Sequence, residues 1–360
     1  MKKILLTLCL LLPLGLQATQ VPELYEVEVA VADQSSGERL KGMSAAIKEV
    51  LVRLSGSKAI VDEAVLASAI ASPGRYVKGY RYERREQADT ELDFLLVNFS
   101  SQALQDLLVE SRLPIWPEQR AEILVWLAID ERPRPYVVKD NPLNIINQAI
   151  NSAAASRGLP LSWPLDSDVD SGKVRATDIK AGFQQQIISA SKDYAAHGIL
   201  VAYIKKLSEE KWQGEWQLVR EGKAVSWSSD VASLDDVMLS GVDAVADILA
   251  GEFSILSGDE QGLLLVTVRN INNLQRYAKS RAYLQDLLIT SDVGVVKVMR
   301  GAVDYQLRLR GKAEEFVRAI NLGGQMRIVP QVIVTQNINP ENRAEIIAPN
   351  QSDYILELIP

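Results

Sequence analysis

The sequence almost lacks the two residues that many enzymes depend on. Its single cysteine is Cys9 and its single histidine is His197. One chain therefore cannot build a cysteine–histidine nucleophile pair, a thiolate zinc site or a site with several histidine ligands. It also lacks the G-x-G-x-x-G, Walker A, G-x-S-x-G and H-E-x-x-H motifs. We expect no cofactor and no catalytic residues, and hence a protein that is not an enzyme.

The sequence around the single histidine indicates a structural role for this residue. His197 precedes Gly198 and a probable strand at 199–204, so the pattern predicts the end of a helix stopped by glycine. A histidine in a last helical turn satisfies terminal carbonyl groups and complements the helix dipole.

Long apolar runs are also scarce, with one exception at the start. Lys2 and Lys3 precede an apolar run from Ile4 to Leu16. This run is shorter than the roughly 17–25 residues that span a bilayer, so it predicts a secretory signal peptide rather than an anchor. We expect cleavage after Ala18, which removes Cys9 and leaves a periplasmic chain without thiols or a transmembrane segment.

The sequence has fewer positively charged than negatively charged residues, 39 against 46. The formal net charge is −7, which argues against a nucleic-acid partner because phosphate contacts need clustered cations. With 360 residues, 47% of them hydrophobic, the chain can bury two or three domain cores.

The order of elements predicts an α+β fold, in which small antiparallel-sheet domains with helices on one face flank a central α/β domain with a mixed sheet. The expected regions are the signal peptide at 1–18, a small α+β domain at 19–117, the central α/β domain at 118–257, a small α+β domain at 258–330 and a polar C-terminal tail at 331–360. Within the tail, residues 332–335 and 354–359 are short strand candidates.

The two small domains share one plan. The first reads as a strand at 25–31, a helix at 38–54, strands at 75–83 and 91–99, and a helix at 102–110. Residues 263–329 repeat this order, and Asp93-Phe94 is echoed by Asp304-Tyr305. A single local match is weak support for duplication.

The central region contains the strong strand 123–129, helices at 143–156, 179–195 and 235–249, and a hairpin at 212–227. A two-residue turn at Glu221-Gly222 would place Trp216 opposite Trp227. We predict that this pair lies in the core, and the alternative is a tryptophan-lined sugar platform.

From Leu24 to about Val329 the chain resembles a family of exported gammaproteobacterial proteins known only as a domain of unknown function. The resemblance rests on the strand 27–31, the helix end 50–56, the strand 79–82 and the segment 126–130. It implies no activity and no site residues. At the level of fold alone, parts of the chain are similar to flagellar assembly protein T and to lipoprotein regulators of peptidoglycan synthesis.

The best candidate binding surface is the strand from residue 76 to residue 84. Side chains alternate across a strand, so its aromatic and cationic residues should share one face, suited to a glycan, a peptide or an anionic lipid head group. The alternative is ordinary cross-strand pairing on a solvated face. The candidate residues are Tyr76, Lys78, Tyr80, Tyr82 and Arg84.

Two groups of carboxylates need explanation. Asp166, Asp168 and Asp170 resemble the start of an EF-hand loop, but Ser171 and Thr177 occupy positions that require glycine and glutamate. They form a weak calcium candidate, and otherwise a solvated acidic loop. Asp235 and Asp236 are expected at the N-terminus of a helix, which favours negative charge. Asp243 and Asp247 are expected one turn apart on a solvated helix face.

These features favour a non-enzymatic periplasmic scaffold that docks other envelope proteins through sheet edges and exposed aromatic residues. The first alternative is a glycan- or peptide-binding module associated with peptidoglycan. The second is a carboxylate-dependent glycan hydrolase.

Overall fold

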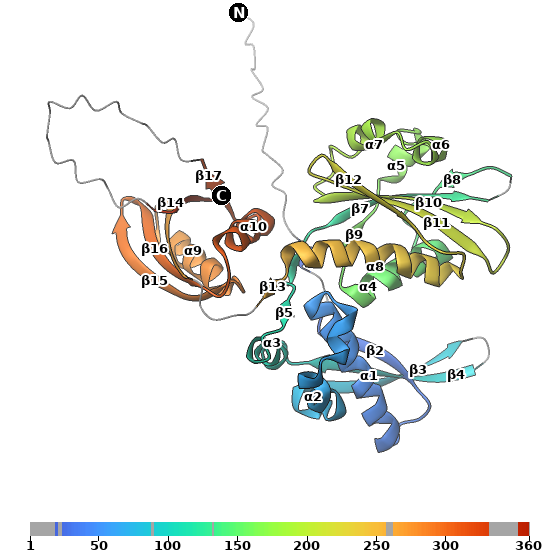
Figure 1. Ribbon diagram of the computed structural model, residues 1–360, viewed down its shortest axis with the longest axis horizontal. Coiled ribbons are helices and arrows are strands. Elements are labelled where there is room, and N and C mark those ends of the chain that lie inside the picture. The colour runs from blue at the N-terminus through green and yellow to red at the C-terminus, as the bar shows by residue number, and fades with distance from the viewer. Residues whose placement is uncertain are drawn as a thin grey trace, which may run out of the picture.

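The computed structural model describes residues 19–20, 24–87, 90–131, 133–256, 262–330 and 352–359. The predicted signal peptide at 1–18 and a strand candidate at 332–335 lie outside these residues. The described residues form three units, each a sheet with helices packed on it (Figure 1). The predicted α+β class is therefore confirmed.

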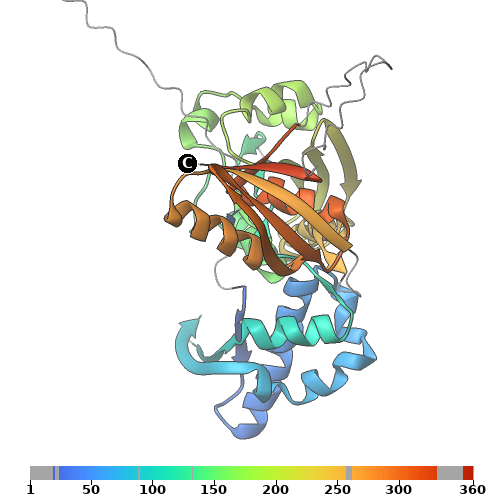
Figure 2. The same cartoon turned by 90° about the vertical axis from the view of Figure 1, so that its left-hand side faces the viewer.

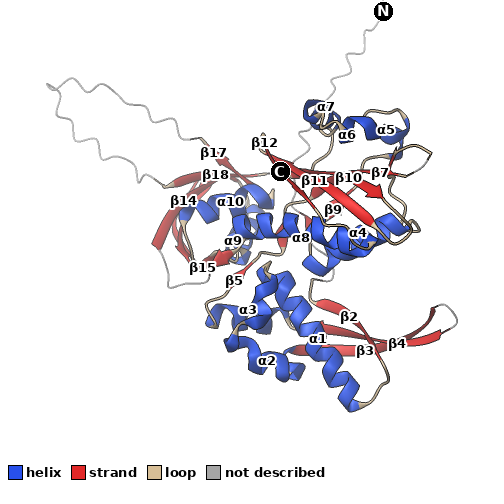
Figure 3. Cartoon of the chain, turned by 45° about the vertical axis from the view of Figure 1, so that its right-hand side comes forward, coloured by secondary structure: helices blue, strands red, loops and turns tan. Residues whose placement is uncertain are grey.

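The N-terminal unit is a three-stranded antiparallel sheet with its helices on one face, as Figure 3 shows. The helix α1 follows a capping serine, Ser35, and ends at Gly56, whose φ of 72° is left-handed. The strand order is β2-β4-β3. The elements are β2 (Glu26–Val31), α1 (Ser36–Ser55), α2 (Ala67–Ala71), β3 (Val77–Gln87), β4 (Thr90–Phe99) and α3 (Ser101–Glu110), with 3-10 turns at Lys58–Asp62, Ala64–Leu66 and Pro73–Tyr76.

The C-terminal unit repeats this arrangement and extends it. Its strand order is β15-β16-β14-β18-β17, in which the first three strands correspond to β3-β4-β2 of the N-terminal unit, with the same antiparallel pairings. The elements are β14 (Gly262–Ile271), α9 (Leu274–Asp286), β15 (Thr290–Met299), β16 (Gly301–Leu309), α10 (Ala313–Gly323), β17 (Met326–Val329) and β18 (Tyr354–Leu358).

The local sequence echo between the two units is offset by one residue. In β4 the core-facing residues are Leu95 and Val97, so Asp93 also points toward the helices. In β16 the core-facing residues are Val303 and Tyr305, so Asp304 points the other way. The shared topology, rather than the matching dipeptide, is what supports a duplication.

Residues 354–358 form a strand, which confirms the strand candidate at 354–359, but they belong to the C-terminal unit rather than to a separate polar tail. They form β18, which lies between β14 and β17, parallel to the former and antiparallel to the latter. Leu356 and Leu358 are fully buried in the core of this unit. The alternating apolar residues of a short terminal strand thus complete the C-terminal sheet.

The central unit is a mixed sheet between two helix layers. Its strand order is β12-β11-β10-β7-β8, with β9 beside β7, and the pairs β7–β10 and β7–β9 are parallel. Figure 1 shows α4 and α8 on one face and α5, α6 and α7 on the other. The elements are β7 (Ile123–Asp130), β8 (Tyr136–Val137), α4 (Ile145–Arg157), β9 (Leu161–Ser162), α5 (Asp166–Asp170), α6 (Ala176–Lys180), α7 (Gln184–Ala190), β10 (Gly198–Lys206), β11 (Trp212–Arg220), β12 (Lys223–Ser228) and α8 (Leu234–Phe253).

The helix expected at 179–195 is instead two short helices. Gly182 has a φ of 68° and separates α6 from α7, because a left-handed residue cannot continue a helix. His197 consequently lies in the loop before β10 and caps no helix. Its Nδ1 accepts a hydrogen bond from the Glu122 amide, and burial lowers its pKa.

The predicted hairpin is confirmed in its register. Trp216 pairs with Trp227, Leu218 with Val225, and the turn falls at Glu221-Gly222. Trp216 is 2% exposed and packs in the core beneath α8, which confirms its core role, whereas Trp227 is half-buried and packs against that core.

Two very short sheets join the three units. The first, β5 (Pro114–Ile115) with β13 (Ile255–Leu256), lies where the N-terminal unit meets the C-terminal end of α8. The second pairs β6 (Gln119–Arg120) with β1 (Thr19–Gln20). Figure 2 shows the N-terminal unit at one end of the molecule, below the other two.

A buried arginine, Arg120, holds the N-terminal and central units together. Its side chain is 0% exposed and donates to the backbone oxygens of Arg53, Arg157 and Gly158 at 2.6, 2.9 and 2.7 Å. The guanidinium also lies 3.9 Å from the centroid of the Trp116 ring. Burial lowers the pKa of Arg120 to about 9, which leaves the side chain charged at neutral pH.

Candidate binding cleft between the N-terminal and C-terminal units

The predicted Tyr76–Arg84 binding face does not form as a continuous surface. Tyr76 ends a 3-10 turn and is 7% exposed, so it belongs to the core rather than to the strand. A bulge then falls between Val77 and Gly79 and leaves Lys78 out of the alternation. These two residues therefore do not share a face with the other three.

Tyr80, Tyr82 and Arg84 do share one side of the sheet, but it is the side that faces the helices. Tyr82 packs against the core, and its ring meets that of Tyr80 edge-on at 6.0 Å. Arg84 is paired with Asp93 at 3.0 Å. Tyr80, which is 48% exposed, is the one ring of this set open to a ligand.

The three aspartates of the calcium candidate lie on a helix instead of encircling an ion. Asp166, Asp168 and Asp170 are part of α5. Lys173 and the Tyr194 hydroxyl hold Asp168 at 2.8 and 2.7 Å, and these hydrogen bonds lower its pKa. In the described part of the chain, no three His, Cys, Asp or Glu residues are grouped as a metal site.

We expect calcium to leave the stability of the protein unchanged. Lys173 and Lys139 already neutralise Asp168 and Asp170, so an ion would have to displace both lysines. Melting curves recorded with and without several millimolar calcium should coincide, with magnesium at equal ionic strength as the control. A saturable rise in melting temperature that Asp168→Asn removes would contradict this expectation.

The paired carboxylates of α8 have structural partners. Asp243 and Asp247 both bind the guanidinium of Arg157, at 2.6 and 2.5 Å, and Arg157 also donates to the Gly56 carbonyl. The expectation of a solvated face is therefore wrong for Asp243, whose side chain is 20% exposed, whereas the side chain of Asp247 is 64% exposed. Asp235 and Asp236 lie in the first turn of α8, at a helix N-terminus as predicted, and Ser233 caps this helix.

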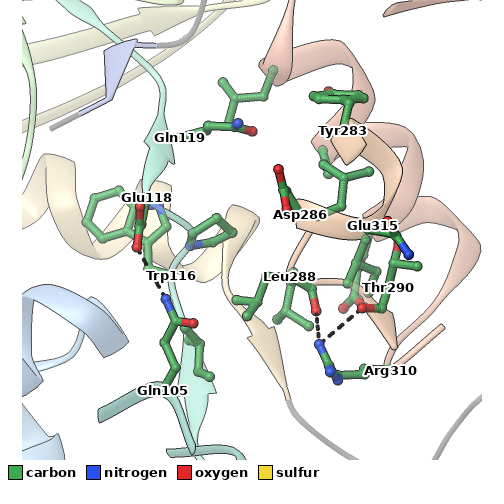
Figure 4. Close-up of a pocket in the computed structure, with 18 of the residues that line it drawn as sticks. Gln105, Trp116, Glu118, Gln119, Tyr283, Asp286, Leu288, Thr290, Arg310 and Glu315 are labelled. Carbon is green, nitrogen blue, oxygen red and sulfur yellow. Dashed lines mark hydrogen bonds between the residues drawn. The ribbon is translucent and has the colours of Figure 1, made fainter. Parts of the chain in front are cut away.

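A cleft of about 740 Å³ opens where the three units meet, and Figure 4 shows its two walls. This volume falls within the range of sites that bind small molecules or short segments of chain. One wall comes from the N-terminal unit and the segment 115–119, and the other from α9, α10 and the start of β15. The end of α8 contributes Phe253 and is followed by Ile255 of β13.

The first wall is organised by a small hydrogen-bond network. The hydroxyl of Tyr25 donates to Glu118 at 2.8 Å, and the amide of Gln105 donates to both, at 2.8 Å to Tyr25 and 3.2 Å to Glu118. Burial and the neighbouring carboxylate raise the pKa of Tyr25. These contacts fix Glu118 at the edge of the cleft.

The second wall consists of one face from each of two helices. Residues three and four apart on a helix share a face, so α9 presents Lys279, Tyr283 and Asp286 together, while α10 presents Arg318 and Leu322. Below them, the Arg310 guanidinium donates to the carbonyls of Leu288 and Thr290 at 2.9 and 3.1 Å and fixes the start of β15.

Three buried side chains in the lining have polar atoms without a hydrogen-bond partner. They are the indole nitrogen of Trp116, the hydroxyl of Tyr283 and the hydroxyl of Thr290, on residues that are 1, 4 and 4% exposed. Burial raises the pKa of Tyr283 to about 12, so it stays protonated. Unpaired buried polar atoms also occur away from the cleft, for example on Asn147 and Trp216, so they do not by themselves mark a ligand site.

The charged side chains of the lining are balanced in sign, and polar amides lie among its apolar residues. Arg318 is half-buried and has no hydrogen bond or ion pair with any described residue. Glutamine amides, which both donate and accept hydrogen bonds, occur on both walls. They belong to Gln102, Gln105, Gln119, Gln285 and Gln325.

Comparison with known families gives a match over part of the chain. Residues 18–117 match the family described as Domain of unknown function (DUF8605). The matched segment covers the N-terminal unit and one wall of the cleft up to Pro117. Comparison with curated proteins gave no match. Within the residues that the structure covers, none of the helices has the length and apolar composition needed to cross a bilayer.

Proposed function

We propose that this protein is a non-enzymatic interaction protein of the bacterial cell envelope, and that it holds an extended segment of a partner protein in the cleft between its units. The observation that carries this proposal is the cleft of about 740 Å³, whose two walls combine glutamine amides with apolar side chains. The predicted signal peptide supports the location.

The lining suits a polypeptide main chain. An extended peptide alternates hydrogen-bond donors and acceptors, and glutamine amides can match either kind. Apolar residues between the glutamines, including Ile115, Leu288 and Leu322, can accommodate the side chains of such a segment. Near-balanced charge around the cleft favours a segment without strong net charge.

A fragment of peptidoglycan is the second candidate, favoured by the same lining. Amide side chains hydrogen-bond to hydroxyl and acetamido groups as well as to peptides, and the volume of the cleft suits a ligand of a few residues.

Photo-crosslinking in intact cells tests the proposal. A photoreactive amino acid at Gln285, on the α9 wall, should yield a defined protein adduct, whereas the same group at Glu221, on the hairpin turn of the central unit, should not. Ala282→Trp fills the cleft from an exposed helical position and should abolish the adduct.

The matched control is Ala67→Trp, which places the same bulk at an exposed position of α2 outside the cleft. Adducts of equal yield at residues 285 and 221, or an adduct that Ala282→Trp leaves intact, would refute the proposal. Loss of the adduct on addition of soluble muropeptides would favour the second candidate.

A further inference from the structure

The two small units share a sheet arrangement, yet their free edges differ in chemistry. The edge strand β3 carries Lys78, Arg81, Arg84 and Arg85, and each of these arginines is ion-paired. Charged residues protect an exposed edge, because a second strand would have to desolvate them in order to pair.

The corresponding edge strand β15 has no such protection over most of its length. Among the strands that the structure describes it pairs only with β16, and Figure 1 shows it at the edge of the C-terminal sheet. Apolar side chains lie open along it, with Val295, Val296, Val298 and Met299 exposed by 39, 49, 67 and 37%. A long apolar edge of this kind is a template for another strand.

The order of residues on β15 is self-complementary. Val296 lies in a bulge, since Val295 and Lys297 pair with consecutive residues of β16. The residues of β15 that pair with successive residues of β16 are therefore 292, 293, 294, 295 and 297. Gly294 is the middle of these five positions. Val293 and Val295 lie next to it, and Asp292 and Lys297 lie at the two ends. An antiparallel pairing centred on Gly294 would match valine with valine and aspartate with lysine.

The two charged residues are available for such a pairing. Asp292 and Lys297 are both exposed, and neither forms an ion pair with any residue that the structure describes.

We propose that a second copy of this chain pairs antiparallel with β15, with Gly294 on the two-fold axis and Asp292 of each copy opposite Lys297 of the other. This inference is independent of the cleft and goes beyond the proposed function. The pairing joins two five-stranded sheets edge to edge and covers the exposed valines. Two equal ion pairs fix its register.

Sedimentation equilibrium of the purified full-length protein tests this pairing through charge reversal. Wild type should show a reversible monomer–dimer equilibrium. Asp292→Lys and Lys297→Asp should each weaken dimerisation by about tenfold or more, because both cross-strand pairs become repulsive. The double variant restores two opposite-charge pairs, and it should dimerise like wild type.

Lys223→Asp is the control, because it reverses one exposed charge on β12, the free edge of the central sheet. It should leave the equilibrium unchanged, and far-UV circular dichroism should show that every variant is folded. A protein that stays monomeric at millimolar concentration, single variants that dimerise normally, or a double variant without recovery would each overturn the proposal.

Discussion

Replacing Arg120 with methionine should lower the free energy of unfolding by about 3–5 kcal/mol. Methionine approximates the volume of the aliphatic stem but donates nothing. The backbone oxygens of Arg53, Arg157 and Gly158 would lose a charged donor in a site that water does not reach. Urea unfolding followed by tryptophan fluorescence measures the loss.

Replacing Arg120 with lysine should not preserve the stability of the protein. The guanidinium reaches three separate chain segments at once, and a single ammonium group lacks the planar fork that allows this. Arg134→Met is the control, because Arg134 is exposed and has no partner among the described residues. Equal stability of the Arg120 and Arg134 variants would show that the junction does not depend on this side chain.

Replacing Gly241 with alanine should destabilise the central unit by about 1–3 kcal/mol. A side-chain carbon at this position of α8 would lie 2.3 Å from the ring of Trp216, which is itself buried in the core. Either the helix or the indole must move, and both are held by close packing.

Gly251→Ala provides a matched comparison on the same helix. No atom lies within 4 Å of an added carbon there, so alanine should stabilise the helix by about 0.5–1 kcal/mol. The melting temperature should therefore fall for Gly241→Ala and rise for Gly251→Ala. A melting temperature for Gly241→Ala at or above that of wild type would contradict the predicted contact between α8 and β11.

Local patterns predicted the elements that depend on neighbouring residues. The hairpin at 212–227 was predictable to the residue, because its two-residue turn fixes the register of both strands. The caps at Ser233 and Gly56 were likewise readable, since capping chemistry lies within a few residues of the helix end.

Contacts between distant segments were not predictable in this way. The prediction that side chains alternate regularly from residue 76 to residue 84 was wrong, because a bulge at Lys78 changes which side of the sheet the residues before it face relative to those after it. Asp243 and Asp247 were interpreted as a solvated pair, because their partner, Arg157, lies on another helix and the local sequence does not indicate the contact. The cleft combines segments from three units, so no local period could have indicated it.

The position of β18 in its sheet has a consequence for the order in which the chain can fold. During synthesis β14 emerges long before residues 354–358, yet β18 must insert beside it before β17 can join the sheet. A nascent chain therefore cannot complete the C-terminal core while these residues remain inside the ribosome. Closing such a distant contact is slow, and an exported polypeptide would keep this unit open until after translocation.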